Sequence, residues 1–202
     1  KILDKYGKVS VITGTNVFAH IDNLEDFMRT SNSLLLEEGI IVIEAPYLLH
    51  LIEKLEYDTI YHEHLSYLSV KPIFEFCKQF DFEVFDVEEQ SIHGGTLRYF
   101  IGRKNKRKIS QNVFNYIKLE DERELYSIDK LRDFAKSVEN HRKELLRLLQ
   151  NLKREGKRIV ALSAPAKGNT LLNYCKIGPE ILDYDTERNP LKIGKFTPGM
   201  HI

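Results

Sequence analysis

Hydrophobic residues alternate between short continuous runs and helical spacing along the first part of the chain. The apolar run at residues 9–13 predicts a buried strand, and residues 15–20 form the loop after its carboxyl end. Residues 22–36 carry apolar side chains at helical spacing, and Gly39 is expected to end that helix. Residues 40–44 are rich in β-branched side chains, which is typical of a buried parallel strand. Strand, helix and strand in this order predict half of a doubly wound sheet.

The next segment predicts a helix and two strands. Residues 70–80 have helical periodicity, and residues 82–87 and 97–101 are strand candidates. The hinge between the two strands contains residues 93–96, whose adjacent glycines indicate a tight turn or close backbone approach to a ligand. The simplest arrangement is a hairpin at the sheet edge.

The remaining residues predict a second α/β unit. Residues 129–155 carry apolar side chains three and four residues apart, which predicts a long helix, and Gly156 is expected to cap it. A strand over residues 158–162, a loop over 163–169 and a helix from residue 170 follow.

A change in composition separates these two parts. Five of the six residues 103–108 are basic, which we interpret as a domain boundary in preference to a binding patch. We therefore expect one domain over residues 1–105 and a second over residues 106–202, which begins with a linker and the long helix.

Composition narrows the classes of function. The chain is 42% hydrophobic and 30% charged, which is typical of a soluble globular protein. Its 30 basic and 30 acidic residues cancel, so nucleic acid is not an expected partner. The longest apolar run is far shorter than the ~20 residues that span a bilayer, and no signal-peptide pattern is present, so we expect a cytoplasmic protein without a membrane partner. Neither cysteine lies in a CxxC pattern, so the sequence gives no ground to expect a disulfide framework or a structural zinc site.

Residues 58–67 hold the densest set of titratable and hydrogen-bonding side chains. Tyr61, His62, Glu63 and His64 are consecutive, and burying such groups unpaired costs roughly 1–3 kcal/mol each, so we expect them to line a cleft. His64 beside Glu63 and Tyr61 suits a general base, because an acid or a phenol can set the tautomer of an imidazole. Two alternatives stay open: the histidines ligate a metal, which needs a third ligand, or they close polar surface loops.

Residues 163–170 lie where a strand is followed by a helix. Free backbone N–H groups and the helix dipole favour a phosphate at that point, and Lys167 adds a positive charge. Arg188, Lys192 and Lys195 could supply further phosphate contacts. The alternative is an ordinary helix start with small residues, because neither a Walker loop nor a GxGxxG pattern is present.

Five blocks, in order and spacing, resemble the sugar C-methyltransferases of deoxysugar biosynthesis. The blocks are residues 16–22, 44–47, 57–67, 93–98 and 164–173. The resemblance implies an α/β fold, the second half of a Rossmann-like methyltransferase sheet followed by a smaller C-terminal nucleotide-sugar-binding unit. It also implies an S-adenosylmethionine-dependent enzyme that methylates carbon 3 of a nucleotide-linked 4-keto-6-deoxy sugar, normally a dTDP sugar.

The resemblance assigns roles to individual residues. It implies that His64 is the general base, with Tyr61, Glu63 and His20 beside it. The block that begins at residue 16 implies S-adenosylmethionine contacts by Asn16 and Phe18. The residues expected to contact the nucleotide sugar are His93, Gly94, Gly95, Arg98, Ser163, Lys167, Asn169, Thr170 and Arg188.

The chain also departs from the family pattern. The family begins with a cysteine-rich zinc module and then the glycine-rich loop and acidic residue that bind S-adenosylmethionine, and none of these occurs here. Zinc is thus expected in the family, but its ligands are absent from this chain, which we expect to be truncated at its N-terminus and to stop before the usual C-terminal end. Glu187 stands where the family tends to carry Asp. The alternatives are a non-catalytic nucleotide-sugar-binding fragment and a metal enzyme that uses His62 and His64.

Overall fold

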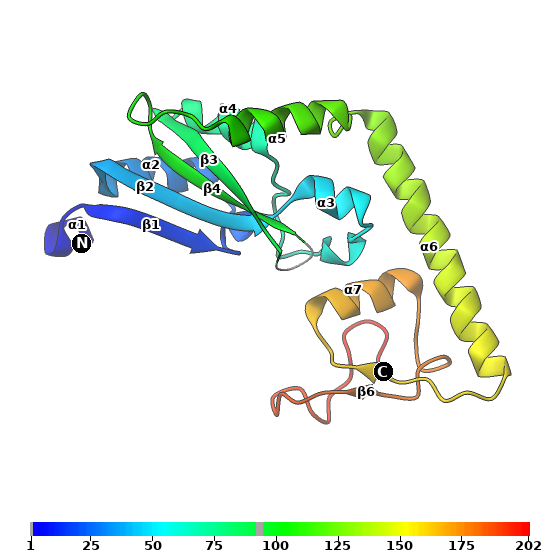
Figure 1. The fold of residues 1–202 in the computed structure, drawn as a ribbon. Coiled ribbons are helices and arrows are strands. Elements are labelled where there is room, and N and C mark those ends of the chain that lie inside the picture. Colours follow the sequence, from blue (N-terminus) through cyan, green and yellow to red (C-terminus); the bar gives the residue numbers. More distant parts are fainter. Residues whose placement is uncertain (1, 92–94) are drawn as a thin grey trace. The chain divides into compact units, whose positions relative to one another are not determined.

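The computed structural model describes residues 2–91 and 95–202 and contains two compact units (Figure 1). The first unit comprises Lys1–Lys54 and Glu63–Leu131, and the second comprises Leu55–His62 and Arg132–Ile202. The expected domains, 1–105 and 106–202, have different bounds, and that division stays a prediction because compact units need not coincide with domains.

A mixed four-stranded sheet forms the first unit. The strand order is β1 (Val9–Thr15), β2 (Leu35–Pro46), β4 (Thr96–Arg103) and β3 (Phe82–Gln90). β1 and β2 are parallel and are connected through α2 (Leu24–Leu34), whereas β4 is antiparallel to both β2 and β3. The predicted strand–helix–strand unit and the hairpin at the sheet edge are therefore confirmed, as is the α/β fold class.

The boundary between α2 and β2 corrects one prediction. We expected Gly39 to end the helix, but α2 ends at Leu34 and Gly39 lies inside β2. A Cβ on Gly39 would lie 2.6 Å from Cγ of Leu35 and 3.0 Å from the carbonyl oxygen of Ser10. A glycine stands there because the Leu35 side chain and the β1 backbone fill the space, and the helix ends without it.

Short helices connect and cover the strands of the first unit. The predicted helix after the polar cluster is confirmed as α4, whereas α3 and α5 were not predicted. The helices are α1 (Ile2–Tyr6), η1 (Phe18–His20), α3 (Leu48–Glu53), α4 (Val70–Lys78) and α5 (Gln111–Glu122). The core of this unit consists of fully buried side chains, among them Met28, Leu35, Ile41, Phe82, Val84, Leu97, Tyr99 and Ile101.

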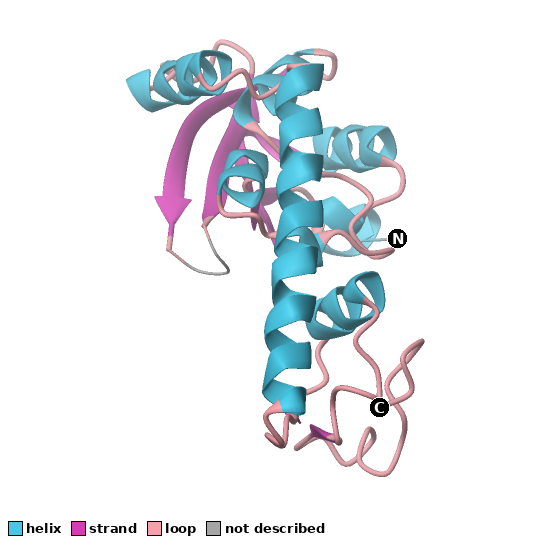
Figure 2. Cartoon of the chain, turned by 90° about the vertical axis from the view of Figure 1, so that its right-hand side faces the viewer, coloured by secondary structure: helices cyan, strands magenta, loops and turns pink. Residues whose placement is uncertain are grey.

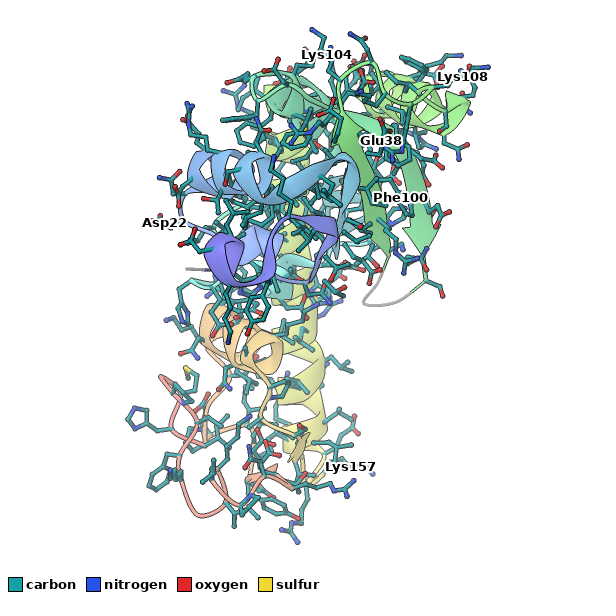
Figure 3. The ribbon with its side chains drawn as sticks, turned by 90° about the vertical axis from the view of Figure 1, so that its left-hand side faces the viewer. Asp22, Glu38, Phe100, Lys104, Lys108 and Lys157 are labelled. Atoms are coloured by element: carbon teal, nitrogen blue, oxygen red, sulfur yellow. The ribbon has the colours of Figure 1, made fainter. Side chains whose placement is uncertain are left out.

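The basic segment after β4 is paired inside the first unit. Lys106 Nζ lies 2.9 Å from a Glu37 carboxylate oxygen, and Arg107 donates to the backbone oxygen of Glu38. Figure 3 labels Lys104, Lys108 and Glu38 in this part of the molecule. Lys106 and Arg107 are thus engaged by acidic and carbonyl groups of the first unit, and the interpretation of the segment as a domain boundary stays a prediction.

The second unit contains a βαβ arrangement. β5 (Ala161–Leu162) and β6 (Asp185–Thr186) are parallel and are connected through α7 (Ala166–Cys175). η2 (Tyr57–Thr59) belongs to this unit and contacts α7, and the Tyr57 hydroxyl lies 2.9 Å from Nδ1 of His141 in α6 (Ile128–Arg154). The predicted second α/β unit is confirmed, although β5 is shorter than expected and α7 begins four residues before residue 170.

The long helix α6 (Ile128–Arg154) ends as predicted. Figure 2 shows it as one continuous helix. Gly156 has φ +75°, and its N–H donates to the Lys153 oxygen at 3.0 Å. The N–H of Lys157 donates to the Leu152 oxygen at 3.0 Å, which completes a glycine-based C-cap. In the described ranges, no helix combines the length and the apolar character that a bilayer-crossing segment needs.

Candidate functional site

His20 and His64 meet after the carboxyl end of β1. His20 is the last residue of η1, which follows that strand. The ring centroids of the two histidines are 4.9 Å apart and their planes are inclined by 82°. The N–H groups of Leu65 and Ser66 donate to the Ala19 carbonyl oxygen at 2.9 and 3.2 Å, which fixes the His64 segment to η1. The structure therefore brings together two of the four predicted catalytic residues.

The same segment is fixed to the sheet at its other end. The N–H of Leu48, just after β2, donates to the Leu68 oxygen at 2.9 Å. Glu120 of α5 is fully buried and accepts hydrogen bonds from the N–H groups of Val70 and Lys71 at 2.6 and 2.9 Å. Val70 and Lys71 are the first two residues of α4, and the side chain of the N-cap residue Ser69 makes no capping hydrogen bond. Glu120 therefore caps the N-terminus of α4.

The four consecutive polar residues are divided between the two units. Tyr61 and His62 belong to the second unit, with ring centroids 6.2 Å apart, and Glu63 and His64 belong to the first. His62 and Glu63 are exposed. The prediction that Tyr61 and Glu63 assist His64 therefore stays a prediction. Within residues 2–91 and 95–202, no three His, Cys, Asp or Glu side chains are grouped as metal ligands.

Asn16 and Phe18 differ in whether their side chains can contact a ligand. Asn16 adopts φ +53° directly after β1, and its N–H donates to the Glu44 oxygen at 2.8 Å. Its side-chain oxygen is buried and has no hydrogen-bond partner in the described part of the chain. Phe18 is only 2% exposed and packs edge to face on Phe27 at 5.3 Å. Asn16 thus fits a ligand that carries hydrogen-bond donors, whereas Phe18 supports this loop from the core.

Arg98 is held by carboxylates on neighbouring strands. Its Nε and Nη2 donate to one oxygen of Glu44 at 3.0 and 2.8 Å, and Nη1 lies 3.8 Å from Glu88. Glu44 is 4% exposed and the Arg98 side chain is 36% exposed, so this ion pair near the end of β2 is half-buried. A ligand that binds Arg98 has to share the guanidinium with Glu44.

The predicted glycine-containing hinge is only partly described. His93 and Gly94 lie outside the described residues. Gly95 has φ +121°, and a Cβ there would lie 2.2 Å from Nδ1 of His50. His50 is a neighbour that sequence reasoning missed, because it sits inside the apolar run of α3. Its Nε2 is 3.5 Å from a Glu89 oxygen, and its buried Nδ1 has no hydrogen-bond partner in the described ranges.

A cavity of about 580 Å³ opens beside the start of α7 in the second unit. Of the predicted substrate residues that the structure describes, only Asn169 lines it. Ser163 is exposed with φ +75°, and Arg188 is exposed. Lys167 is half-buried in the first turn of α7. Thr170 donates to the Ala166 oxygen at 3.1 Å and lines a different cavity of about 360 Å³ beside Tyr57 and Tyr174.

Glu187 already occupies part of the expected phosphate position. It accepts hydrogen bonds from the N–H groups of Asn189 at 3.1 Å, Arg188 at 2.7 Å and Ala164 at 3.3 Å. These backbone donors lower the pKa of Glu187 to about 2. Lys192 donates to the Ala164 oxygen at 2.8 Å and lies 3.5 Å from Glu187. One N–H of this loop is therefore taken by a carboxylate, and the cationic groups lie on the segment after β6.

Comparison with known proteins identifies the chain. Residues 91–202 match the family model described as the C-methyltransferase C-terminal domain. The chain belongs to the C-methyltransferase family. Residues 1–87 match a model described as a methyltransferase domain, in agreement with the Rossmann-like α/β arrangement of the first unit. It is also 28% identical over 203 residues to the C-methyltransferase NovU of Streptomyces niveus, an alignment that covers 100% of this chain and 48% of that protein. The chain thus spans about half the length of this relative, and the family resemblance seen in the sequence is confirmed.

Proposed function

We propose that the full-length protein transfers a methyl group from S-adenosylmethionine to carbon 3 of a dTDP-linked 4-keto-6-deoxy sugar, with His64 as the general base. The observation that carries this proposal is the His20–His64 pair beside the carboxyl end of β1, in a chain that belongs to the C-methyltransferase family. Ligands of open α/β sheets bind at the carboxyl ends of the strands, so the pair lies where a reacting centre is expected.

The chemistry requires a base next to the sugar. A proton on the carbon beside the ketone is acidic, and an imidazole nitrogen of His64 takes it while the electron pair moves onto the ketone oxygen. The resulting carbanion forms the new carbon–carbon bond. When bound, S-adenosylmethionine supplies the methyl group on a sulfonium, whose sulfur keeps the electron pair of the broken bond. His20, packed edge to face on His64, restricts rotation of its ring and so holds the base in position.

Asn16 is the described residue that best fits a cofactor contact. Its buried side-chain oxygen lacks a donor, and S-adenosylmethionine carries ammonium and hydroxyl donors. Phe18 would act indirectly by holding this loop against the core through Phe27. We propose that Tyr61 and Glu63 tune the charge of the base.

The second unit is proposed to anchor the nucleotide. Ser163, Lys167, Asn169, Thr170 and Arg188 lie in or near the loop and helix of its βαβ arrangement. The hinge, with His93, Gly94, Gly95 and Arg98, is proposed to contact the sugar. In this scheme residues 1–105 carry the reacting centre and residues 106–202 the nucleotide, and the protein acts in the cytoplasm.

An assay of methyl transfer tests the proposal. The full-length protein is incubated with labelled S-adenosylmethionine and the dTDP-linked keto sugar, and the methylated carbon is located by NMR. We expect the labelled methyl group to be attached to carbon 3. The rate of methyl transfer should fall by about 100- to 10,000-fold for His64→Ala. The variant His62→Ala, at an exposed neighbouring residue, should react at nearly the parent rate. Nucleotide binding by calorimetry without any methyl transfer would instead support a binding protein.

A further inference from the structure

Tyr67 places an aromatic ring beside the imidazole of His64. The two ring centroids are 6.4 Å apart, and the ring planes are inclined by 87°. The ring of His20 meets the same imidazole at 4.9 Å and 82°. Aromatic rings with centroids about 4.5–7 Å apart favour such edge-to-face arrangements. The His64 ring therefore has two perpendicular neighbours, one from η1 and one from its own segment.

The backbone around Tyr67 is fixed on both sides. The N–H of Ser66 donates to the carbonyl oxygen of Ala19 at 3.2 Å. The carbonyl oxygen of Leu68 accepts a hydrogen bond from the N–H of Leu48 at 2.9 Å. Ala19 and Leu68 are buried in the core of the first unit. Because both anchors belong to the core, the Tyr67 ring can move away from His64 only through its own side-chain torsions, which favour staggered rotamers.

The Tyr67 side chain is also suited to mutation. It is 37% exposed, so its truncation leaves no closed cavity in the core. Substitutions at such positions usually change the free energy of unfolding little. A variant at this position is therefore expected to fold, and its effect on the His64 ring can be measured separately from stability.

We infer that Tyr67 is a positioning residue for His64. Its ring, together with that of His20, limits rotation of the imidazole and keeps one ring nitrogen directed toward the reacting carbon. The inference rests on the proposed function, because it takes His64 as the general base. The ring of Tyr67 carries this role and its hydroxyl does not, because the contact is between the two rings.

NMR relaxation of the His64 ring tests the inference directly. The full-length protein is labelled with carbon-13 at histidine Cε1, and the His64 signal is identified by its absence in His64→Ala. Rigid groups have order parameters of about 0.85, and flexible groups lie below about 0.6. The order parameter of the His64 Cε1–H bond is expected to be near the rigid value in the parent and in Tyr67→Phe, and to fall toward the flexible range in Tyr67→Ala.

Proton transfer tests the consequence for catalysis. The full-length protein is mixed with S-adenosylhomocysteine and the dTDP-linked keto sugar in deuterated water, and deuterium uptake at carbon 3 is followed. Uptake should slow by about 10-fold in Tyr67→Ala, because a mobile base is less often in the reactive position. KM for the sugar in the methyl-transfer reaction should stay near the parent value. Tyr67→Phe should restore the parent rate, because it keeps the ring.

Phe114→Ala is the matched control. Phe114 of α5 is 45% exposed, and its ring centroid lies 6.3 Å from that of Phe74 with the planes inclined by 69°. The variant therefore removes an exposed ring with a contact of similar length on another helix. It should leave the His64 order parameter and the uptake rate at the parent values. Thermal melting verifies that each variant is folded.

The outcomes separate this inference from the proposed function. An unchanged His64 order parameter in Tyr67→Ala overturns the inference, whatever the rate of methyl transfer. Equal losses of uptake in Tyr67→Ala and Tyr67→Phe also overturn it, because they would assign the effect to the hydroxyl. A parent protein that gives neither uptake nor methyl transfer at carbon 3, with a His64 ring that still loosens in Tyr67→Ala, contradicts the proposed function and confirms the restriction of the ring.

Discussion

The imidazole rings of His20 and His64 meet edge to face with centroids 4.9 Å apart. The two residues are distant in sequence, and backbone hydrogen bonds from Leu65 and Ser66 to Ala19 join their segments. A base that must take a proton from carbon needs a ring held in one position. These contacts hold the His64 ring in position, because they join its segment to the residues that follow β1.

Removal of His20 tests this positioning role. We expect His20→Ala to lower kcat of the full-length enzyme by about 100-fold while KM changes little, because a slightly misplaced base slows chemistry more than binding. Steady-state kinetics measures the split. Val17→Ala, a change at a 52% exposed side chain of the same loop, is the control and should leave both constants near the parent values. An effect of His20→Ala on KM alone would contradict the positioning role.

Gly95 should not tolerate a side chain. Its φ of +121° disfavours any L-residue, and a Cβ would lie 2.2 Å from Nδ1 of His50. Strain and overpacking together predict that Gly95→Ala lowers the free energy of unfolding by about 2–5 kcal/mol. Urea denaturation measures the change. Gly14→Ala is the control, because a Cβ there meets no atom within 4 Å. Adding His50→Ala should recover part of the loss, and no recovery would show that the contact with His50 is not the cause.

Glu120 should contribute far more to the free energy of unfolding than its exposed neighbours do. Glu120→Ala leaves the N–H groups of Val70 and Lys71 without their acceptor, and we expect a loss of about 2–4 kcal/mol in the free energy of unfolding. Hydrogen exchange should accelerate at these two amides. Glu122→Ala removes only an exposed pair with Lys118 and should cost less than about 0.5 kcal/mol. Equal losses for the two variants would contradict the capping role.

The ionised carboxylate of Glu187 should contribute to stability in a defined pH range. Its pKa falls from the ordinary 4.5 to about 2 in the folded protein, so its contribution is present above about pH 4.5 and is lost as pH falls toward 2. We therefore expect Glu187→Gln to melt at a lower temperature than the parent at pH 7, with a difference that shrinks between pH 4.5 and the acid limit of folding. Glu155→Gln, at an exposed site, should follow the parent at every pH. A difference that does not change with pH would assign the effect of Glu187 to its shape alone.

The strands and amphipathic helices could be predicted because burial leaves a pattern in the sequence. The β-branched run of residues 40–44 and the apolar spacing of α6 are such patterns, and both elements are present. Helix α5 shows the limit of this approach. Only Val113 and Glu120 of that helix are buried, and one of the two is charged, so burial leaves a weak pattern in its sequence. Contacts with β3 and α4 hold the helix in place.

The site also contains residues that a sequence pattern reveals and residues that it does not. His64 was found because polar residues are concentrated around it, and His20 only through the family resemblance. His50 was missed, since it lies in the apolar run of helix α3.

Exchange of the substrate proton with solvent tests the central claim most directly. The full-length protein is mixed with S-adenosylhomocysteine and the dTDP-linked keto sugar in deuterated water, and incorporation at carbon 3 is followed by NMR. Enolisation by His64 predicts deuterium uptake catalysed by the parent and by His62→Ala, and a loss of at least 100-fold in His64→Ala with S-adenosylhomocysteine affinity retained. Uptake at the parent rate in His64→Ala would contradict the assignment of His64 as the base.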